Sequence, residues 1–137
     1  MGRVLALDVG TKTIGIAVTD PLRLFAQPVS TLSRRGVDRD VTALLVVLDE
    51  FEPDVVVVGM PYELDGSETR SARLARQIGT AVEERSGRTV AYQDERFSSV
   101  EAERMLIAQN VKRQRRKEVI DQAAAVVILE SWMRQNP

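Results

Sequence analysis

The sequence predicts an α/β protein with a mixed five-stranded sheet and helices on its faces, in the order β-β-β-α-β-α-β-α-α. Short apolar and β-branched runs open the chain as a hairpin meander, and later runs of this kind alternate with segments of helical periodicity. A meander followed by alternating helices and strands is typical of a mixed sheet. Because the 137 residues contain no repeat and no long linker, we expect one domain over residues 1–137.

The first three strands are predicted from apolar runs and turn residues. The stretches from Val4 to Leu7 and from Ile14 to Val18 are separated by a segment with a glycine and two threonines, which favours an antiparallel hairpin. A third strand is expected from Phe25 to Leu32, where apolar residues stand between polar ones. Pro28 within it indicates an edge strand, because proline has no N–H to donate.

The middle of the chain is predicted to alternate helices and strands. From Asp38 to Phe51, apolar residues recur at spacings of three and four, as in an amphipathic helix. The run from Val55 to Val58 is uniformly apolar, which is typical of a strand buried on both faces. A helix from about Glu68 to Arg85 and a fifth strand from Thr89 to Tyr92 follow.

Two helices complete the predicted order. Ser98 is an N-cap candidate, and Glu101 three residues later would complete a capping box. The last helix is expected from about Glu118 to Met133. The strongly basic segment from residue 112 to residue 117 is expected to precede it.

The composition limits the chemistry that the protein can perform. The sequence has no histidine and no cysteine, which excludes Ser-His and Cys-His nucleophile pairs, disulfides, thiol redox chemistry and the usual zinc sites. An enzyme of this composition must use carboxylates. No apolar run approaches the ~18 residues of a membrane-spanning helix, and the N-terminus does not resemble a signal peptide. We therefore expect a cytoplasmic protein that does not bind membranes.

Three acidic positions are candidates for one site. Asp8 directly follows an apolar strand, and ligand sites of such sheets usually lie at strand ends. Asp94 and Glu95 close the fifth strand, and alternation allows only one of them to face the same side as Asp8. We choose Glu95 and keep Asp94 in reserve. Asp121 lies on the apolar stripe of the last helix, where a carboxylate is costly unless a cation meets it.

Each acid also has a purely structural interpretation. An aspartate after a strand can simply start a turn, and the acids that close the fifth strand can pair with Arg96. An aspartate in a first helical turn is favoured by the helix dipole. Three carboxylates at one sheet edge, however, form the oxygen-rich site that Mg²⁺ or Mn²⁺ prefers. Two such ions about 3.5–4 Å apart support phosphodiester hydrolysis without histidine or cysteine.

Basic residues near this site are predicted to bind a phosphate backbone, although charge runs are often only solvated faces. Arg70, Arg73 and Arg76 occupy successive turns of the second predicted helix and could extend the basic track. The basic residues that we predict to contact substrate are Arg70, Lys112, Arg113, Arg115, Arg116 and Lys117. Because aromatic residues make up only 4% of the chain, we expect recognition of backbone and shape rather than base stacking.

Four motifs, in order and at matching spacing, resemble the YqgF family, also called RuvX, of the ribonuclease H-like superfamily. They are Leu7 to Ala17, Val58 to Pro61 with Asp65 to Ser67, Asp94 to Ser98, and Asp121 to Ala125 with Ile128 to Ser131. The resemblance implies a ribonuclease H-like fold and a metal-dependent nuclease of the bacterial cytoplasm. Members of the family are assigned to Holliday-junction processing and to maturation of the 5′ end of pre-16S rRNA.

The resemblance also implies roles for individual residues. It places the family's acidic triad on Asp8, Glu95 and Asp121, with the first bridging two metal ions and the others each completing one. Thr11 and Lys12 in the first hairpin are expected to approach a substrate phosphate. The expected partner is nucleic acid: a DNA junction, single-stranded DNA or precursor rRNA. A resolvase of symmetric junctions should form a homodimer on its substrate, whereas an exonuclease or an RNA-processing enzyme has no such need.

Two other function classes fit parts of the sequence. The hairpin from Asp8 to Thr11, followed by Gly15, resembles the phosphate-binding hairpin of sugar kinases and actin-like ATPases. Those proteins close two such domains around a nucleotide, and this chain is long enough for one. A nucleic-acid-binding protein without catalysis is the second alternative, and the intact acidic triad speaks against it.

Overall fold

A computed structural model describes residues 2–63, 65–94 and 113–137, the last segment by its backbone alone as far as residue 121. The elements are β1 (Val4–Val9), β2 (Thr13–Thr19), β3 (Ala26–Ser33), α1 (Val37–Phe51), β4 (Val55–Met60), α2 (Arg70–Ser86), β5 (Thr89–Asp94) and α4 (Arg113–Gln135). All five predicted strands and three of the four predicted helices are confirmed. The helix predicted after Ser98 lies outside the described residues.

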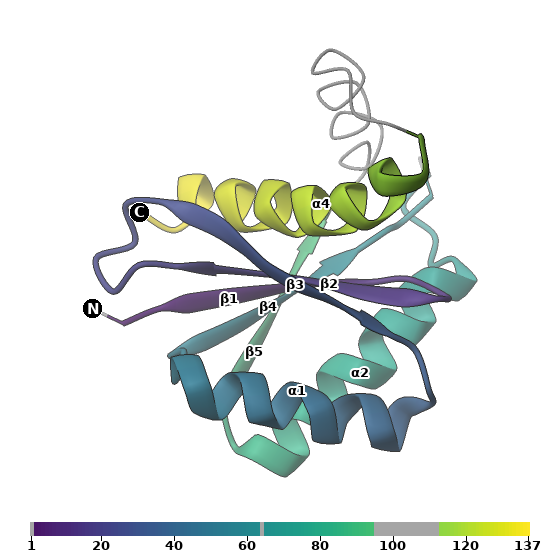
Figure 1. Cartoon of the computed structure of the whole chain (residues 1–137), viewed down its shortest axis with the longest axis horizontal. Helices are drawn as coiled ribbons and strands as arrows, with labels where there is room; N and C mark the ends of the chain where they lie inside the picture. Colours follow the sequence, from purple (N-terminus) through teal and green to yellow (C-terminus); the bar gives the residue numbers. More distant parts are fainter. Residues whose placement is uncertain (1, 64, 95–112) are drawn as a thin grey trace.

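The five strands form one mixed sheet in the order β3-β2-β1-β4-β5. The pairs β1–β2 and β2–β3 are antiparallel, and the pairs β1–β4 and β4–β5 are parallel. Helices α1 and α2 cover one face of the sheet, and α4 covers the other (Figure 1). The strand that contains Pro28 is an edge strand, as predicted, and β1 is in the centre.

Alternation along the strands divides the core into two layers. Leu5, Leu7 and Val9 of β1 face α1 and α2, whereas Val4 and Ala6 face α4. The second layer is completed by small and branched residues of the other elements: Ala17, Val57, Ala125, Ile128 and Leu129. Strand β4 contributes fully buried valines to both layers, which confirms the prediction for this apolar run.

The start of the last helix differs from the prediction. Helix α4 begins at Arg113 rather than near Glu118, so most of the basic segment forms its first turns instead of preceding it. Arginine, lysine, glutamine and glutamate are good helix formers, and no glycine or proline separates the segment from the apolar stripe. The helix therefore extends N-terminally through charged residues that contribute nothing to its apolar periodicity.

Helix α4 runs antiparallel to β1, so its first half lies toward the carboxyl end of that strand (Figure 1). Its other end is fixed near the start of β1. The Arg23 guanidinium stacks on the Trp132 ring at 5.9 Å from the ring centroid, and Arg23 Nε donates to the Gly2 carbonyl at 2.7 Å. None of the helices within the described residues is long and apolar enough to cross a membrane.

Candidate active site

Asp8 is the penultimate residue of β1 and lies between two glycines in the sheet. It pairs with Gly15 on β2. On the other side Leu7 pairs with Val58, so the next step of the same register brings Gly59 beside Asp8. Directly paired residues on one face normally bring their side chains within about 5 Å of each other. Because glycine has no side chain, neither neighbouring strand places a side chain directly beside the half-buried Asp8.

The Asp8 side chain lies on the α4 face of the sheet, because it alternates with Leu7 and shares the face of Val4 and Ala6. Gln93 of β5 completes this row, since Gly59 pairs with Gln93. The Gln93 side chain is only 7% exposed. Its amide donates to the Asp94 carbonyl at 3.5 Å, a long contact that does little for a buried amide.

Asp94, the reserve acid, lies on the opposite face of the sheet from Asp8. Its side chain alternates with Gln93 and shares the face of Tyr92. Tyr92 packs against α2, because a Cβ added at Gly79 of that helix would lie 2.5 Å from the tyrosine hydroxyl. Asp94 is exposed at the end of β5. Glu95, the acid that we predicted as the ligand, lies outside the described residues.

The position of Asp121 is described by its backbone alone. It lies in α4, one turn before Ala124 and Ala125, both of which are fully buried. Ala125 packs in the second core layer with Ala6 of β1. Among the residues whose side chains are described, no group of three carboxylates could hold a metal ion. Two of the three predicted ligands are not in that set.

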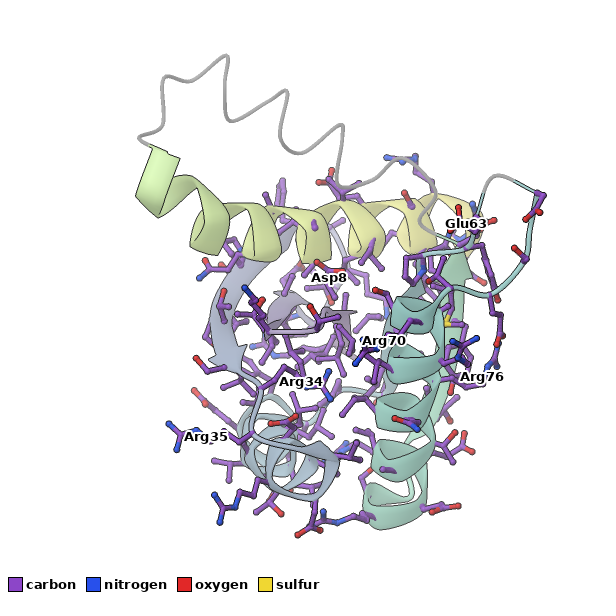
Figure 2. The ribbon with its side chains drawn as sticks, turned by 90° about the vertical axis from the view of Figure 1, so that its right-hand side faces the viewer. Asp8, Arg34, Arg35, Glu63, Arg70 and Arg76 are labelled. Carbon is purple, nitrogen blue, oxygen red and sulfur yellow. The ribbon has the colours of Figure 1, made fainter. Side chains whose placement is uncertain are left out.

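The β1–β2 turn carries the predicted phosphate contacts Thr11 and Lys12, and both residues are exposed. The turn is closed by the Gly10 N–H, which donates to the Thr13 carbonyl at 2.8 Å. Arg34, which follows β3, reaches this turn and donates from Nη1 to the Gly10 carbonyl at 2.7 Å. Figure 2 views this end of the sheet, with Asp8 below α4 and Arg34 nearer to α1.

Arg70, another predicted phosphate contact, is the first residue of α2 and is exposed. Figure 2 shows it at the same end of the molecule as Asp8. The helix begins there because the Thr69 hydroxyl accepts a hydrogen bond from the Ala72 N–H at 2.9 Å. The same hydroxyl donates to the Pro61 carbonyl at 3.1 Å and so connects the helix start to the end of β4.

The turn before α2 is stabilised by Asp65. Its Oδ1 accepts hydrogen bonds from the Ser67 hydroxyl at 2.7 Å and from the Ser67 N–H at 2.9 Å. These bonds, with the hydroxyl contribution the larger, lower the pKa of Asp65. Gly66 has a φ of 89°, a value that favours glycine. The Asp65–Ser67 part of the recognised motif is therefore a turn with a structural basis of its own.

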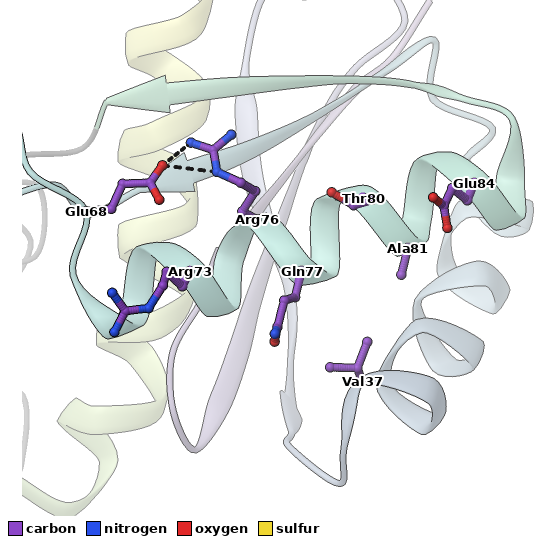
Figure 3. Close-up of a pocket in the computed structure, with 8 residues that line it drawn as sticks. All are labelled: Val37, Glu68, Arg73, Arg76, Gln77, Thr80, Ala81 and Glu84. Carbon is purple, nitrogen blue, oxygen red and sulfur yellow. Dashed lines mark hydrogen bonds and ion pairs between the residues drawn. The ribbon is translucent and has the colours of Figure 1, made fainter.

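A groove lies elsewhere on the molecule. It has a volume of about 730 Å³ and runs along the outer side of α2 toward α1 (Figure 3). Its lining residues are Val37, Glu68, Arg73, Arg76, Gln77, Thr80, Ala81 and Glu84. Arg76 is paired with Glu68, which raises the pKa of the arginine, and its guanidinium lies 5.2 Å from the centroid of the Tyr92 ring. Balanced charge and the absence of Asp8 from the lining separate this groove from the predicted site.

Comparison with known proteins identifies the family. A family model described as "RuvX: Holliday junction resolvase" matches residues 2–135. The chain belongs to this family. Its membership confirms the prediction of a YqgF-type nuclease with a ribonuclease H-like fold.

Relatives in other bacteria match over nearly the whole chain. A protein of Myxococcus xanthus is 45% identical over 131 residues, which cover 96% of this chain and 87% of the relative. A protein of Lactococcus lactis is 42% identical over 137 residues and covers 96% of this chain and 93% of the relative. Both carry the name "Putative pre-16S rRNA nuclease".

Solved structures of resolvases share the fold. RuvC of Thermus thermophilus in complex with a Holliday junction has a TM-score of 0.60 at 16% identity and covers 99% of this chain and 97% of that one. The yeast mitochondrial Holliday junction resolvase has a TM-score of 0.60 at 12% identity, and the match covers 97% of this chain and 78% of that one. At these identities the likeness concerns the fold.

Proposed function

We propose that the protein hydrolyses phosphodiester bonds of precursor rRNA at a carboxylate site formed by Asp8, Glu95 and Asp121, with Mg²⁺ or Mn²⁺ as cofactor. The observation that carries this proposal is the position of Asp8. It lies near the carboxyl end of the central strand, on the α4 face, between Gly15 and Gly59. A carboxylate near the end of the central strand suits a hard divalent ion together with a phosphate oxygen.

The geometry of α4 supports Asp121 as the second acid. Trp132 is fixed near Gly2 through Arg23. Position 121 lies 11 residues before Trp132, about 16 Å along a helix. Asp8 lies six residues after Gly2, about 20 Å along a strand. Because the two elements run antiparallel and pack together (Figure 1), these lengths bring position 121 toward the strand end that carries Asp8.

The alternation of β5 supports Glu95 over Asp94 as the third acid. Asp94 belongs to the face that packs on α2, with Tyr92. Asp94 therefore does not share the face of Asp8 and Gln93. Glu95 is therefore our choice for the ligand, and its role is tested separately from that of Asp8 below.

The donor set fits hard divalent cations. Carboxylate oxygens are the ligands that Mg²⁺ and Mn²⁺ prefer, and the sequence has no histidine or cysteine that would favour zinc or copper. Two bound ions would supply an activated water and charge stabilisation at the leaving oxygen. Asp8, Glu95 and Asp121 would together hold the ions.

The basic residues would hold the substrate in line with the acids. Lys12 and Thr11 extend from the turn that follows Asp8, and Arg70 stands at the start of α2 at the same end of the sheet (Figure 2). Residues 113–117 form the first turns of α4, at the helix end near the carboxyl end of β1. Contacts of this kind neutralise phosphates without reading bases.

We favour precursor rRNA because the relatives at 42–45% identity are named pre-16S rRNA nucleases and match this chain over nearly their whole length. Processing of an rRNA precursor requires no dimer. A symmetric DNA junction would instead require two active sites and hence a homodimer.

The test is a cleavage assay on four labelled substrates: a fragment spanning the 5′ end of a 16S precursor, a four-way DNA junction, single-stranded DNA and duplex DNA. The wild type and the Asp8→Asn, Glu95→Gln, Asp94→Asn and Asp121→Asn variants are assayed with Mn²⁺, Mg²⁺ or chelator. We expect the first, second and fourth variants to lose at least roughly a hundredfold in rate without a change in melting temperature. Asp94→Asn should retain activity.

Asp54→Asn is the matched control. Asp54 is an exposed carboxylate just before β4, at the opposite end of that strand from Gly59, and it pairs with Arg23 at 3.6 Å. Its loss should leave cleavage unchanged. Full activity of Asp8→Asn, or equal activity with chelator, would contradict the metal-carboxylate mechanism. Cleavage of the junction alone, with a dimer in sedimentation equilibrium, would replace rRNA by DNA as the substrate.

A further inference from the structure

Arg34 holds the β1–β2 turn at two points. Its Nη1 donates to the Gly10 carbonyl at 2.7 Å, and its backbone N–H donates to the Lys12 carbonyl at 2.8 Å. These two carbonyls lie on either side of Thr11. The segment that follows Asp8 is therefore fastened to the residue that follows β3, 24 positions later in the chain.

The guanidinium of Arg34 is itself held by a buried carboxylate. Its Nε donates to Asp40 Oδ2 at 2.6 Å, and the other carboxylate oxygen accepts from the Arg35 N–H at 2.8 Å. The two side chains of the pair are only 11% and 3% exposed. Because a buried ion pair contributes little net stability against apolar residues of similar size, its principal effect here is a fixed geometry.

We propose that the Arg34–Asp40 pair positions the turn so that Lys12 contacts a substrate phosphate beside Asp8. In this role Arg34 is a positioning residue that acts through Lys12. The Arg34 donors are directed at the Gly10 carbonyl and at Asp40, and its side chain is nearly covered, whereas Lys12 is exposed. This inference rests on the proposed function, because it assigns the turn to the same substrate.

The arginine cannot be replaced by another cation. A guanidinium reaches Asp40 and the Gly10 carbonyl at once with donors in a fixed plane, whereas a lysine ammonium is a single point charge on a flexible chain. Arg34→Lys therefore keeps the charge that balances Asp40 and releases the turn. The substitution therefore tests the effect of positioning the turn without changing the charge of residue 34.

The experiment is a double-mutant cycle on substrate binding. Arg34→Lys, Lys12→Ala and the combination are prepared in the Asp8→Asn background, which prevents cleavage during titration. The probe is a fluorescein-labelled RNA spanning the 5′ end of a 16S precursor, followed by anisotropy at several salt concentrations. We expect each single variant to weaken binding about three- to tenfold, and the combination to be no weaker than Lys12→Ala. In each of the three variants, the slope of the logarithm of the binding constant against the logarithm of the salt concentration should fall in magnitude by about 0.7–0.9, which corresponds to the loss of one phosphate contact.

Two further variants protect the result against a folding artefact. Asp40→Asn removes the carboxylate charge that holds the Arg34 guanidinium, and it should weaken RNA binding as much as Arg34→Lys does. Arg88→Lys is the matched control, since Arg88 also holds two backbone carbonyls, those of Pro53 and Leu48, at 2.8 and 3.4 Å. It lies at the far end of α1 and should not change binding. Melting curves verify that all variants are folded.

Additive losses in the combined variant would overturn the proposal, because Arg34 would then act independently of Lys12. Unchanged binding of Arg34→Lys would overturn it as well. Failure of the proposed function has a different signature: the wild type would bind the RNA without cutting it, while the coupling between the two residues persisted.

Discussion

At the scale of single residues, the site depends on what surrounds Asp8 as much as on the carboxylate. Across the sheet, Thr31, Gly15 and Asp8 form one row, and one further step of the β1–β4 register adds Gly59 and its partner Gln93. Adjacent strands lie about 4.8 Å apart, so Asp8 and Gln93 are separated by about 10 Å of backbone. The glycine between them leaves that span without a side chain. On the face that α4 covers, no side chain of the sheet therefore stands directly between the acid and the amide.

Gln93 should matter more for activity than for stability. Its amide is buried and has one long hydrogen bond within the described residues, so an apolar side chain of similar size costs little there. We expect Gln93→Met to leave the free energy of unfolding within about 1 kcal/mol of the wild type and to lower the cleavage rate roughly tenfold. Urea unfolding and the cleavage assay measure the two effects.

The control for Gln93 is a buried residue on the same face that lies farther from the row. Val57→Ala removes two methyl groups from the core below α4, where Val57 is fully buried. It should lower the unfolding free energy by roughly 1–3 kcal/mol and leave the rate per folded molecule unchanged at saturating Mn²⁺. If Gln93→Met gave the same pattern as Val57→Ala, Gln93 would be an ordinary core residue.

At the scale of elements, the β2–β3 turn shows how one carboxylate can order a segment that buries little. Asp20 Oδ1 accepts from the N–H groups of Leu24 and Phe25 at 2.8 Å each, and Oδ2 accepts from the Leu22 N–H at 3.2 Å. The side chains of these three apolar residues are 63–74% exposed. Hydrogen bonds to the charged carboxylate, that from Phe25 first, lower the pKa of Asp20 below 3.8.

The stability of this turn should depend on pH in the acid range. A group with a depressed folded-state pKa contributes stability above its unfolded pKa, near 3.8 here, and loses it as the pH falls through the folded value. We expect Asp20→Asn to loosen the turn at neutral pH and to match the wild type at the lowest pH. Carboxyl carbon NMR titration and limited proteolysis between pH 2 and 6 provide the measurement. A titration midpoint of Asp20 at or above 3.8 would refute the assignment.

Helix α4 begins with charges of unfavourable sign. The N-terminus of a helix carries a partial positive charge, yet the first turn of α4 contains no acid and the segment 113–117 is basic. The free protein therefore bears a repulsion that a bound phosphate would relieve. Such an arrangement is expected where substrate binding, rather than stability, has determined the sequence.

Neutralising this segment should stabilise the free protein and weaken binding. For Arg115→Gln with Arg116→Gln, we expect the unfolding free energy at low salt to rise by about 0.3–1 kcal/mol per charge. Affinity for the labelled precursor RNA should fall, with a smaller salt slope. Arg134→Gln is the control, because Arg134 lies in the last turn, where a positive charge is favourable. Its loss should slightly destabilise the helix and leave binding intact. Normal RNA binding by the double variant would mean that residues 113–117 do not contact the substrate.

At the scale of the whole molecule, the features that could be predicted from the sequence are those that depend on local periodicity, namely the strands and the apolar faces of the helices. Alternation and apolar runs gave the five strands, and spacings of three and four gave the apolar faces of the helices. The start of α4 was wrong because residues 113–117 have high helix propensity but no apolar period. The sequence did not single out Gln93 and Arg34, because the roles proposed for them depend on cross-strand register and on a contact 24 residues distant. Neither relation leaves a local signal.

The two faces of the sheet should respond differently to core damage. Ile78 of α2 and Ile128 of α4 are both fully buried, one in each core layer. Truncation of either to alanine should lower the unfolding free energy by about 2–5 kcal/mol. The activities of the two variants can therefore be compared at a low temperature at which both remain folded. Only α4 carries one of the proposed ligands, Asp121.

We therefore expect Ile128→Ala to raise the Mn²⁺ concentration needed for half-maximal cleavage several-fold, while Ile78→Ala leaves it near the wild-type value. A cavity below α4 lets the helix shift relative to β1 and separates Asp121 from Asp8, whereas a cavity below α2 leaves this distance unchanged. Metal titrations of the cleavage rate, with both variants verified as folded by circular dichroism, decide the matter. Equal metal dependence in the two variants would mean that α4 does not complete the site, and that the proposed ligands other than Asp121 suffice.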